Sequence, residues 1–272
     1  MKSALGLILG VSILATLVGC DNGGDDTGGG AMAVSGSSNT SAGTGNNTAG
    51  TSVVPNGGSA SNTGGSASGG GAELPSGVPL TPTDGWVDGA GNEIMVQGAM
   101  FSYADDTSKT GMTEDFMGDH ACIKGTAAKV DLKCTPVAPA TDCYGTFWGA
   151  AIGLNLNQPN DPATMMGGDP MPYDASALKG FAFEITGAMV PTSLRFKIEN
   201  ASGEYCTPPA KPVKLGANSF NFTDLMTQCW KAGGMSAEGA KSGIVKIAWQ
   251  VVTNDKSTVP FDYCVANVRA LK

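Results

Sequence analysis

The chain has 272 residues and a formal net charge of −8, with only 16 Lys and Arg residues, which form no basic cluster. An acidic chain without a basic patch lacks what binding to a phosphate backbone requires, so nucleic acid is excluded as the expected partner. The seven cysteines include no CxxC pair and no cluster with histidine, and we therefore expect no zinc site.

Residues 1–19 have the layout of a secretory signal peptide, with a cation at Lys2 and an apolar run from Ala4 to Val18. The run is shorter than the roughly 20 apolar residues that a permanent membrane span needs, which favours a cleaved signal. The sequence Leu17-Val18-Gly19-Cys20 resembles the lipobox of bacterial lipoproteins. This resemblance implies cleavage before Cys20, acylation of Cys20 and stable membrane anchoring without a transmembrane helix.

The same resemblance implies a place in the bacterial cell envelope. Asp21, directly after the cysteine, resembles the signal that retains some lipoproteins in the inner membrane of enteric bacteria. Inner and outer membrane therefore both stay open, and we expect the outer membrane or the cell surface.

Residues 20–76 form the predicted linker, because the chain after Cys20 consists almost entirely of Gly, Ser, Thr, Asn and Ala. Such a composition cannot bury enough apolar area to offset the entropy of ordering the backbone, so we expect a disordered tether. A Gly/Ser-type coil of about 56 residues has a root-mean-square span of roughly 40 Å. Residues 77–272 then form one folded domain, a length that suits a single β-sandwich.

Two short segments with strand periodicity, Phe181–Ile185 and Leu194–Ile198, organise this domain. The side chains that alternate onto their apolar faces are Phe181, Phe183 and Ile185 in the first and Leu194, Phe196 and Ile198 in the second. A period of two residues is typical of strands with one buried face, and each such strand needs a partner layer. The connection Gly187–Ser193 is too short for a crossover helix, so a loop is expected there.

Further strands are predicted on the same grounds at Glu93–Tyr103, Ala121–Val130, Phe147–Asn157, Asn218–Thr223, Ile244–Thr253 and Phe261–Leu271. Trp148 and Trp249 fall on apolar faces and are expected in the core. The one helical segment that we predict is Thr223–Trp230. The fold class predicted is all-β, a jelly-roll β-sandwich of two antiparallel sheets.

The order of these segments resembles the galactose-binding-like jelly rolls of bacterial carbohydrate-binding modules. The matching pieces are Phe181–Phe183, Leu194–Ile198, Phe220–Leu225, Ile247–Trp249 and Ala266–Leu271. The resemblance implies a non-catalytic domain that binds a glycan or cell-surface polysaccharide. It implies no cofactor other than a structural calcium ion, for which Asp105, Asp106 and Asp262 are candidate ligands.

Six cysteines remain once Cys20 is assigned to lipidation, and an even number in an exported domain indicates disulfide bonds. Fifteen connectivities are open to six cysteines. We expect Cys134–Cys143 and Cys206–Cys229 to close loops and Cys122–Cys264 to link an early strand to the last one.

A sugar-binding site needs aromatic rings beside hydrogen-bonding side chains, because a sugar ring has an apolar face and a rim of hydroxyls. Trp86, Tyr144, Tyr205 and Trp230 fall in loops or at strand ends and are expected to be exposed. Of these, Tyr144, Tyr205 and Trp230 are the candidates for binding. The polar candidates on strands are Asn155, Arg195, Lys197 and Gln250. Since successive jelly-roll strands often change sheets, Arg195, Lys197 and Glu199 are expected on one face and Glu184, Lys246 and Gln250 on the other. A charged, solvated sheet surface is the alternative interpretation of these polar residues.

Two other functions stay open. The sandwich could recognise another envelope protein as an adhesion or structural module. It could also be a glycoside hydrolase, with a carboxylate pair drawn from Glu184, Glu199, Glu204 and Asp262. The only histidine, His120, has no GxSxG motif to serve, so no catalytic residue is assigned.

Overall fold

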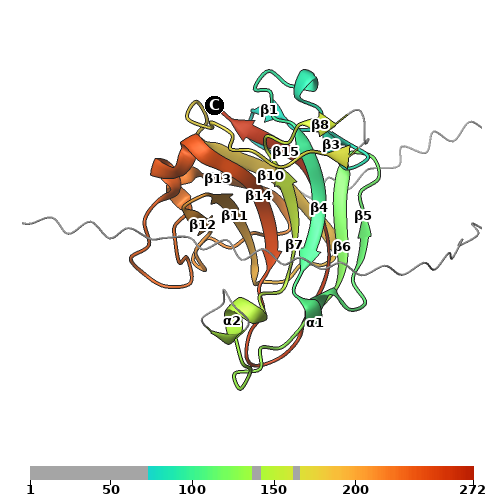
Figure 1. Cartoon of the computed structure of the whole chain (residues 1–272), viewed down its shortest axis with the longest axis vertical. Coiled ribbons are helices and arrows are strands. Elements are labelled where there is room, and N and C mark those ends of the chain that lie inside the picture. The colour runs from blue at the N-terminus through green and yellow to red at the C-terminus, as the bar shows by residue number, and fades with distance from the viewer. Residues whose placement is uncertain (1–72, 137–141, 162–165) are drawn as a thin grey trace, which may run out of the picture. The chain divides into compact units, whose positions relative to one another are not determined.

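The computed structural model describes residues 73–136, 142–161 and 166–272. The predicted signal peptide, Cys20 and the linker up to residue 72 lie outside the described residues. The described chain forms a jelly-roll β-sandwich in which every ladder between strands is antiparallel, as Figure 1 shows. The predicted fold class is therefore confirmed.

One sheet has six strands. It contains, in order, β13 (Gly216–Asn221), β10 (Gly180–Met189), β15 (Val259–Leu271), β6 (His120–Ala127) and β5 (Thr113–Asp115), with β1 (Val78–Pro79) paired to β15. The second sheet has seven strands and carries the site described below. It contains, in order, β12 (Gly203–Cys206), β11 (Leu194–Asn200), β14 (Ile244–Val251), β7 (Ala150–Asn155), β4 (Gly98–Ala104), β3 (Trp86–Val87) and β2 (Pro82–Thr83).

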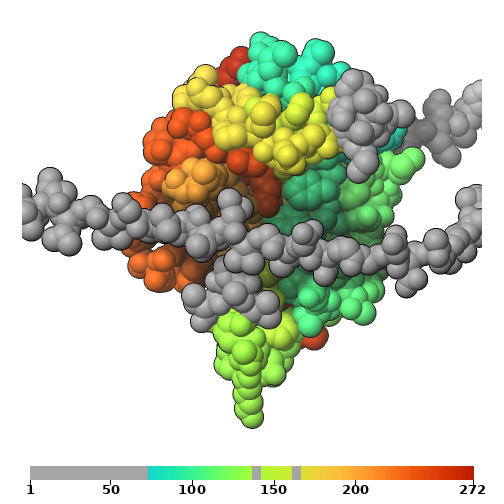
Figure 2. Space-filling model, in the orientation of Figure 1, coloured from blue at the N-terminus to red at the C-terminus, as the bar shows by residue number. Residues whose placement is uncertain are grey.

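Short elements connect these sheets. They are the hairpin β8 (Asn160–Asp161) and β9 (Met166–Gly167), the helices α1 (Asp106–Lys109) and α2 (Cys143–Thr146), and the 3-10 turns η1 (Gly89–Gly91), η2 (Phe222–Asp224) and η3 (Ala237–Gly243). In Figure 1, α2 lies beyond the lower end of β7. Figure 2 shows the yellow segment, which includes the described chain after β9, over the upper part of the face toward the viewer.

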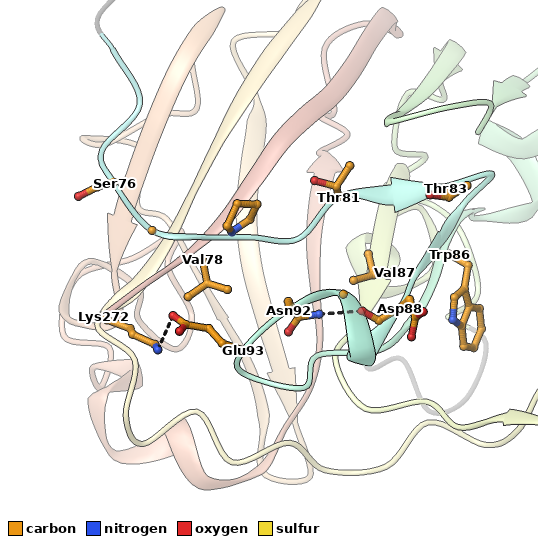
Figure 3. Close-up of a pocket in the computed structure, with 13 residues that line it drawn as sticks. Ser76, Val78, Thr81, Thr83, Trp86, Val87, Asp88, Asn92, Glu93 and Lys272 are labelled. Atoms are coloured by element: carbon orange, nitrogen blue, oxygen red, sulfur yellow. Dashed lines mark hydrogen bonds and ion pairs between the residues drawn. The ribbon is translucent and has the colours of Figure 1, made fainter.

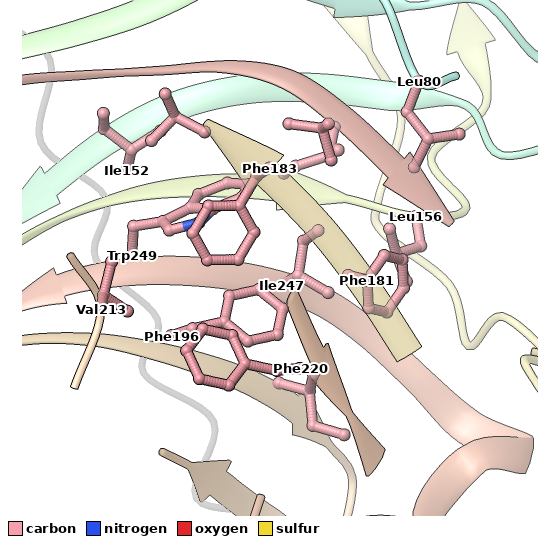
Figure 4. Packing of buried hydrophobic residues seen from close by; sticks show 14 of the residues in the cluster. Leu80, Ile152, Leu156, Phe181, Phe183, Phe196, Val213, Phe220, Ile247 and Trp249 are labelled. Atoms are coloured by element: carbon pink, nitrogen blue, oxygen red, sulfur yellow. The ribbon is translucent and has the colours of Figure 1, made fainter. Parts of the chain in front are cut away.

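The core lies between the two sheets and contains the predicted alternating side chains. Phe181 and Phe183 of β10 are fully buried and face Phe196 of β11 and Trp249 of β14 (Figure 4). The ring centroids of Phe183 and Trp249 lie 5.3 Å apart in an edge-on arrangement, which is favourable for aromatic pairs. The two segments thus lie in opposite sheets, and the prediction that each needs a facing layer is confirmed.

Several predicted elements differ from the structure. The strand predicted to begin at Glu93 begins at Gly98, because Met95 adopts a left-handed φ of 57° that interrupts an extended chain. The helix predicted at Thr223–Trp230 is wrong. Only η2 is helical there, since Met226 forms extended bridges to Cys206 and Ser236. Strands β5 and β12 were not predicted.

All three disulfide pairings expected from the sequence are present. Cys122 and Cys264 are directly opposite one another on β6 and β15, with a Cα–Cα distance of 3.9 Å. Cys134 is bonded to Cys143, and Cys206 of β12 is bonded to Cys229. The last bond bears on the site, because it fixes the loop that carries Trp230 to an edge strand.

Within the described ranges, no helix has the length and apolar composition that crossing a membrane requires. In the same part of the chain, no three His, Cys, Asp or Glu side chains gather as metal ligands would. Of the calcium candidates, Asp105 accepts hydrogen bonds from Thr107, Ser108 and Gly149, and Asp262 pairs with Lys124.

Candidate functional site

One cavity, of about 890 Å³, lies between the first described residues and the C-terminus (Figure 3). Two pairs of its polar groups bond to one another: the Asn92 amide donates to the carbonyl oxygen of Asp88, and Lys272 pairs with Glu93 at 2.6 Å. Ser76, Thr81 and Thr83 also line this cavity, whose one aromatic residue within the described chain is Trp86. A second cleft has a different character.

This second cleft, of about 630 Å³, lies on the outer face of the seven-stranded sheet. Its walls combine aromatic rings with charged and amide side chains, contributed mainly by β4, β11, β14 and the segment around α2. The lining residues are Tyr103, Asp142, Tyr144, Gly145, Trp148, Arg195, Lys197, Glu199, Glu204, Trp230, Lys246, Gln250, Val252 and Thr253. We call it the sheet-face cleft.

Small residues on β7 leave space for the aromatic rings of β4, of which Tyr103 forms the aromatic side of the sheet-face cleft together with Trp148. Phe101 and Tyr103 of β4 are paired with Gly153 and Ala151 of β7. A Cβ atom on Gly153 would lie 2.7 Å from the Phe101 ring, so a larger residue there would displace that ring. An aromatic ring of the protein therefore occupies the space that the small residues on this face of β7 leave.

Trp148 joins this aromatic side because the chain turns at Gly149. Strand alternation would place Trp148 on the same inner face as Ala150, but Gly149 adopts a φ of +104°, which reverses the direction of the preceding side chain. The turn is held by the Asp105 carboxylate, which accepts a 2.6 Å hydrogen bond from the Gly149 amide. Trp148 is half-buried and packs on Tyr103 with ring centroids 5.3 Å apart. Its predicted place in the core is therefore wrong.

A buried lysine lies beside Tyr103, with its Nζ atom 5.8 Å from the centroid of that ring. Only 3% of the Lys197 side chain is exposed, and its Nζ atom lies 2.8 Å from Glu199 and 2.9 Å from Glu204. Lys246 completes the network with a 2.8 Å ion pair to the second oxygen of Glu199. The Lys246 ammonium also lies 4.6 Å from the Tyr103 ring centroid, a cation–π contact. Lys197 is thus a fixed group of the cleft and not a solvated surface cation.

The shifts in pKa of Lys197 and Glu199 keep these two groups charged at neutral pH. Burial alone would lower the pKa of Lys197, but the carboxylates of Glu199 and Glu204 raise it. Burial alone would raise the pKa of Glu199, yet Lys197 and Lys246 lower it below its usual value. Burial raises the pKa of Tyr103, so its hydroxyl stays protonated. The cleft therefore offers hydrogen-bond donors and acceptors in fixed positions.

Arg195 and Trp230 form the far edge of the cleft. The Arg195 guanidinium lies 5.9 Å from the Trp230 ring centroid, and 60% of Trp230 is exposed. The Cys206–Cys229 bond holds this loop to β12, so Trp230 is brought to the sheet by a covalent link. Burial lowers the pKa of Arg195, and Glu204 partly offsets this effect.

Five of the seven predicted ligand-binding residues line the sheet-face cleft: Tyr144, Arg195, Lys197, Trp230 and Gln250. Asn155 lines an adjoining cavity of about 550 Å³ and donates a hydrogen bond to Gln158. Tyr205 is 8% exposed and points into the core, because its pairing with Ile198 places it on the inner face. The expected exposure of Tyr205 is therefore wrong.

The expected division of the polar strand residues between two faces is also wrong. Gln250 is paired with Arg195, and Lys246 is paired with Glu199, so all four share one face. Glu184 alone is separate, on β10, where it accepts a hydrogen bond from Asn267. Sequence reasoning missed Tyr103, Trp148 and Asp142 as cleft residues and considered Glu204 only as a hydrolase carboxylate.

No protein-family model matches this chain, and no protein of curated function matches it. Among solved structures, the chain is similar to the family 11 carbohydrate-binding module of the cellulosomal cellulase Lic26A-Cel5E of Clostridium thermocellum. The TM-score is 0.38 and the identity 11%, over 72% of this chain and 96% of that one. An exo-beta-agarase aligns with a TM-score of 0.29 and 11% identity, over 73% of this chain and 23% of the agarase. At these TM-scores neither likeness bears on function.

Proposed function

We propose that this protein is a surface lipoprotein whose β-sandwich binds carbohydrate, without catalysis, in the sheet-face cleft. The observation that carries the proposal is that Trp148 and Tyr103 pack together in the cleft beside the buried ion-pair network of Lys197. Aromatic rings offer an apolar surface to a sugar ring, and fixed charged groups bond its hydroxyls. The lipid anchor rests on the lipobox-like sequence before Cys20 and is part of the proposal.

Binding fits the cleft better than hydrolysis does. A glycosidase needs one carboxylic acid that is protonated when it meets the glycosidic oxygen, which requires a raised pKa. Glu199 and Glu204 both bond to Lys197, and Lys197 and Lys246 lower the pKa of Glu199. Glu199 is therefore a poor general acid.

Recognition of another envelope protein remains the alternative. A site for a flat protein surface would place its aromatic residues outward on the sheet, whereas Tyr103 and Trp148 are half-buried in a cleft. Tyr144 and Trp230 also line the cleft and are exposed, so the recessed pair of Tyr103 and Trp148 is what favours a sugar ring over a protein surface.

The test is affinity electrophoresis of the full chain through gels that contain single polysaccharides. We compare wild type with Trp148→Ala and use Trp86→Ala as the matched control. Trp86 is also half-buried but lines the cavity near the C-terminus. The proposal expects at least one polysaccharide to retard wild type and Trp86→Ala, with retardation lost in Trp148→Ala.

Two results would contradict the proposal. Absence of retardation by every polysaccharide, together with co-purification of an envelope protein, would favour protein recognition. Release of reducing sugar that disappears in Glu199→Gln would favour a hydrolase.

A further inference from the structure

We propose that the glycan bound in the sheet-face cleft is anionic, and that Arg195 binds its carboxylate or sulfate group. This inference rests on the proposed function and names the class of ligand that the same site selects. Its basis is the distribution of charge among the side chains that line the cleft.

The two lysines of the cleft are already neutralised. Lys197 bonds Glu199 and Glu204, and Lys246 bonds the second oxygen of Glu199. Two ammonium groups thus share two carboxylates at distances of 2.8 to 2.9 Å. This network leaves no net charge for a ligand to compensate.

Arg195 is different, because its guanidinium makes no hydrogen bond and no ion pair with any residue that the structure describes. Its one described contact is with the Trp230 ring, at 5.9 Å. Glu204 is the nearby acid that acts on it electrostatically, yet that carboxylate is bonded to Lys197. The five N–H donors of Arg195 therefore face the cleft without protein acceptors.

The remaining acid of the cleft does not balance this cation locally. Asp142 caps α2 and accepts a 2.9 Å hydrogen bond from the amide of Gly145, and its side chain is exposed to solvent. An exposed carboxylate is screened by water and salt, whereas Arg195 is half-buried. The partly desolvated guanidinium is thus the positive point of the cleft.

The surroundings of Arg195 suit a charged sugar. A guanidinium binds a carboxylate or sulfate with two parallel hydrogen bonds between opposite charges, which are stronger than the bonds it forms to neutral hydroxyls. Trp230 beside it offers an apolar surface to the ring that carries the anion. Gln250 is paired with Arg195 across the strands. Its side-chain amide donates a hydrogen bond to the carbonyl oxygen of Trp148, which fixes the position of Gln250 between the two tryptophans.

The experiment is isothermal titration of the full chain with two matched pairs of oligosaccharides. Oligogalacturonate and its methyl ester differ in carboxylate charge, and carrageenan oligosaccharides and their chemically desulfated forms differ in sulfate. The variants are Arg195→Gln, which removes the charge, and Arg195→Lys, which keeps the charge but loses the planar fork. Arg269→Gln is the matched control, because Arg269 is the only other arginine of the chain and lies on β15 of the other sheet.

We expect one acidic member to bind at least tenfold more tightly than its neutral partner. This difference in affinity should shrink in high salt and disappear in Arg195→Gln. It should persist in part in Arg195→Lys and remain unchanged in Arg269→Gln. Which pair shows the preference identifies the anion as carboxylate or sulfate.

Equal binding of the acidic and neutral members, or a preference that survives in Arg195→Gln, would overturn this inference and leave the proposed function intact. Absence of binding to all four ligands and to the wider polysaccharide panel would overturn the proposed function as well. Circular dichroism of each variant confirms that it is folded, and Arg195→Lys provides the comparison where Arg195→Gln does not fold.

Discussion

Lys197 and Glu199 form a 2.8 Å ion pair at the floor of a cleft, although only 3% of the lysine side chain is exposed. The two residues are separated by one position on β11, so strand geometry places both on the outer face. A buried cation held in this way is costly to desolvate and is stable only while its carboxylate partners remain.

We expect Lys197→Met to lower the free energy of unfolding by about 2 kcal/mol, because it leaves Glu199 and Glu204 without their shared cation. The loss is smaller than for a fully buried pair, since Glu204 is half exposed and Glu199 keeps Lys246. Urea denaturation measures the effect. Lys124→Met is the control, because its ion pair with Asp262 is largely exposed and should contribute less than about 0.5 kcal/mol. Equal losses in the two variants would show that burial of Lys197 has no energetic consequence.

Glu199 should contribute to stability in a pH-dependent way. Its pKa is lower in the folded protein than the ordinary value of 4.5, so the unfolded chain binds more protons in that range. The stabilisation is complete above pH 4.5 and is lost as the pH falls through the folded pKa. We expect Glu199→Gln to be less sensitive to acidification than wild type when melting temperatures are compared from about pH 6 to about pH 3.

The control for this effect is Glu184→Gln. Glu184 accepts its described hydrogen bond from the neutral amide of Asn267 and lies on the other sheet. A Glu184→Gln variant that loses as much acid sensitivity as Glu199→Gln would contradict the assignment of this effect to the cleft network.

Gly149→Ala should disrupt the aromatic side of the cleft. The substitution imposes a side chain at a φ of +104°, and its Cβ would overlap the carbonyl oxygen of Val251. We expect a loss of more than about 2 kcal/mol in unfolding free energy and a shift in the fluorescence of the displaced Trp148. Gly239→Ala is the matched control, since nothing lies within 4 Å of the added atom and no unusual φ is needed. Wild-type stability of Gly149→Ala would show that the turn tolerates a side chain.

Two of the three disulfides should differ in their contributions to stability. Paired Cys→Ala substitutions at Cys122 and Cys264, which are 142 residues apart, should cost roughly 5 kcal/mol, because the loop they close is long. Removal of Cys134–Cys143, with a separation of nine, should cost roughly 2.5 kcal/mol. Thermal and urea denaturation of the two double variants measure which one loses more unfolding free energy. The reverse order would show that loop closure does not govern their effect.

The core strands could be predicted from the sequence, because the alternation in Phe181–Ile185 and Leu194–Ile198 is a local pattern that burial on one face imposes. The edge strand β12 could not. It has four residues, and the orientation of Tyr205 is set by its pairing with Ile198 of β11, which is not visible in the sequence around it.

The site was predictable only in part, for the same physical reason. Arg195, Lys197 and Gln250 were identified as polar residues on strands, but their convergence depends on β11 and β14 being neighbours, which is a property of the strand order. Trp148 was assigned to the core because alternation was extended through Gly149. Gly149, directly after Trp148 at the start of the strand, was the local signal that the alternation ends there.

The most direct test of the central proposal is chemical-shift mapping of the isotopically labelled chain with a saccharide that retards it in the gel. We expect amide and indole signals to shift in the sheet-face cleft, at Tyr103, Trp148, Lys197, Trp230 and Gln250. Shifts confined to Trp86 and the other residues of the cavity near the C-terminus, or no saturable shifts at all, would contradict the account.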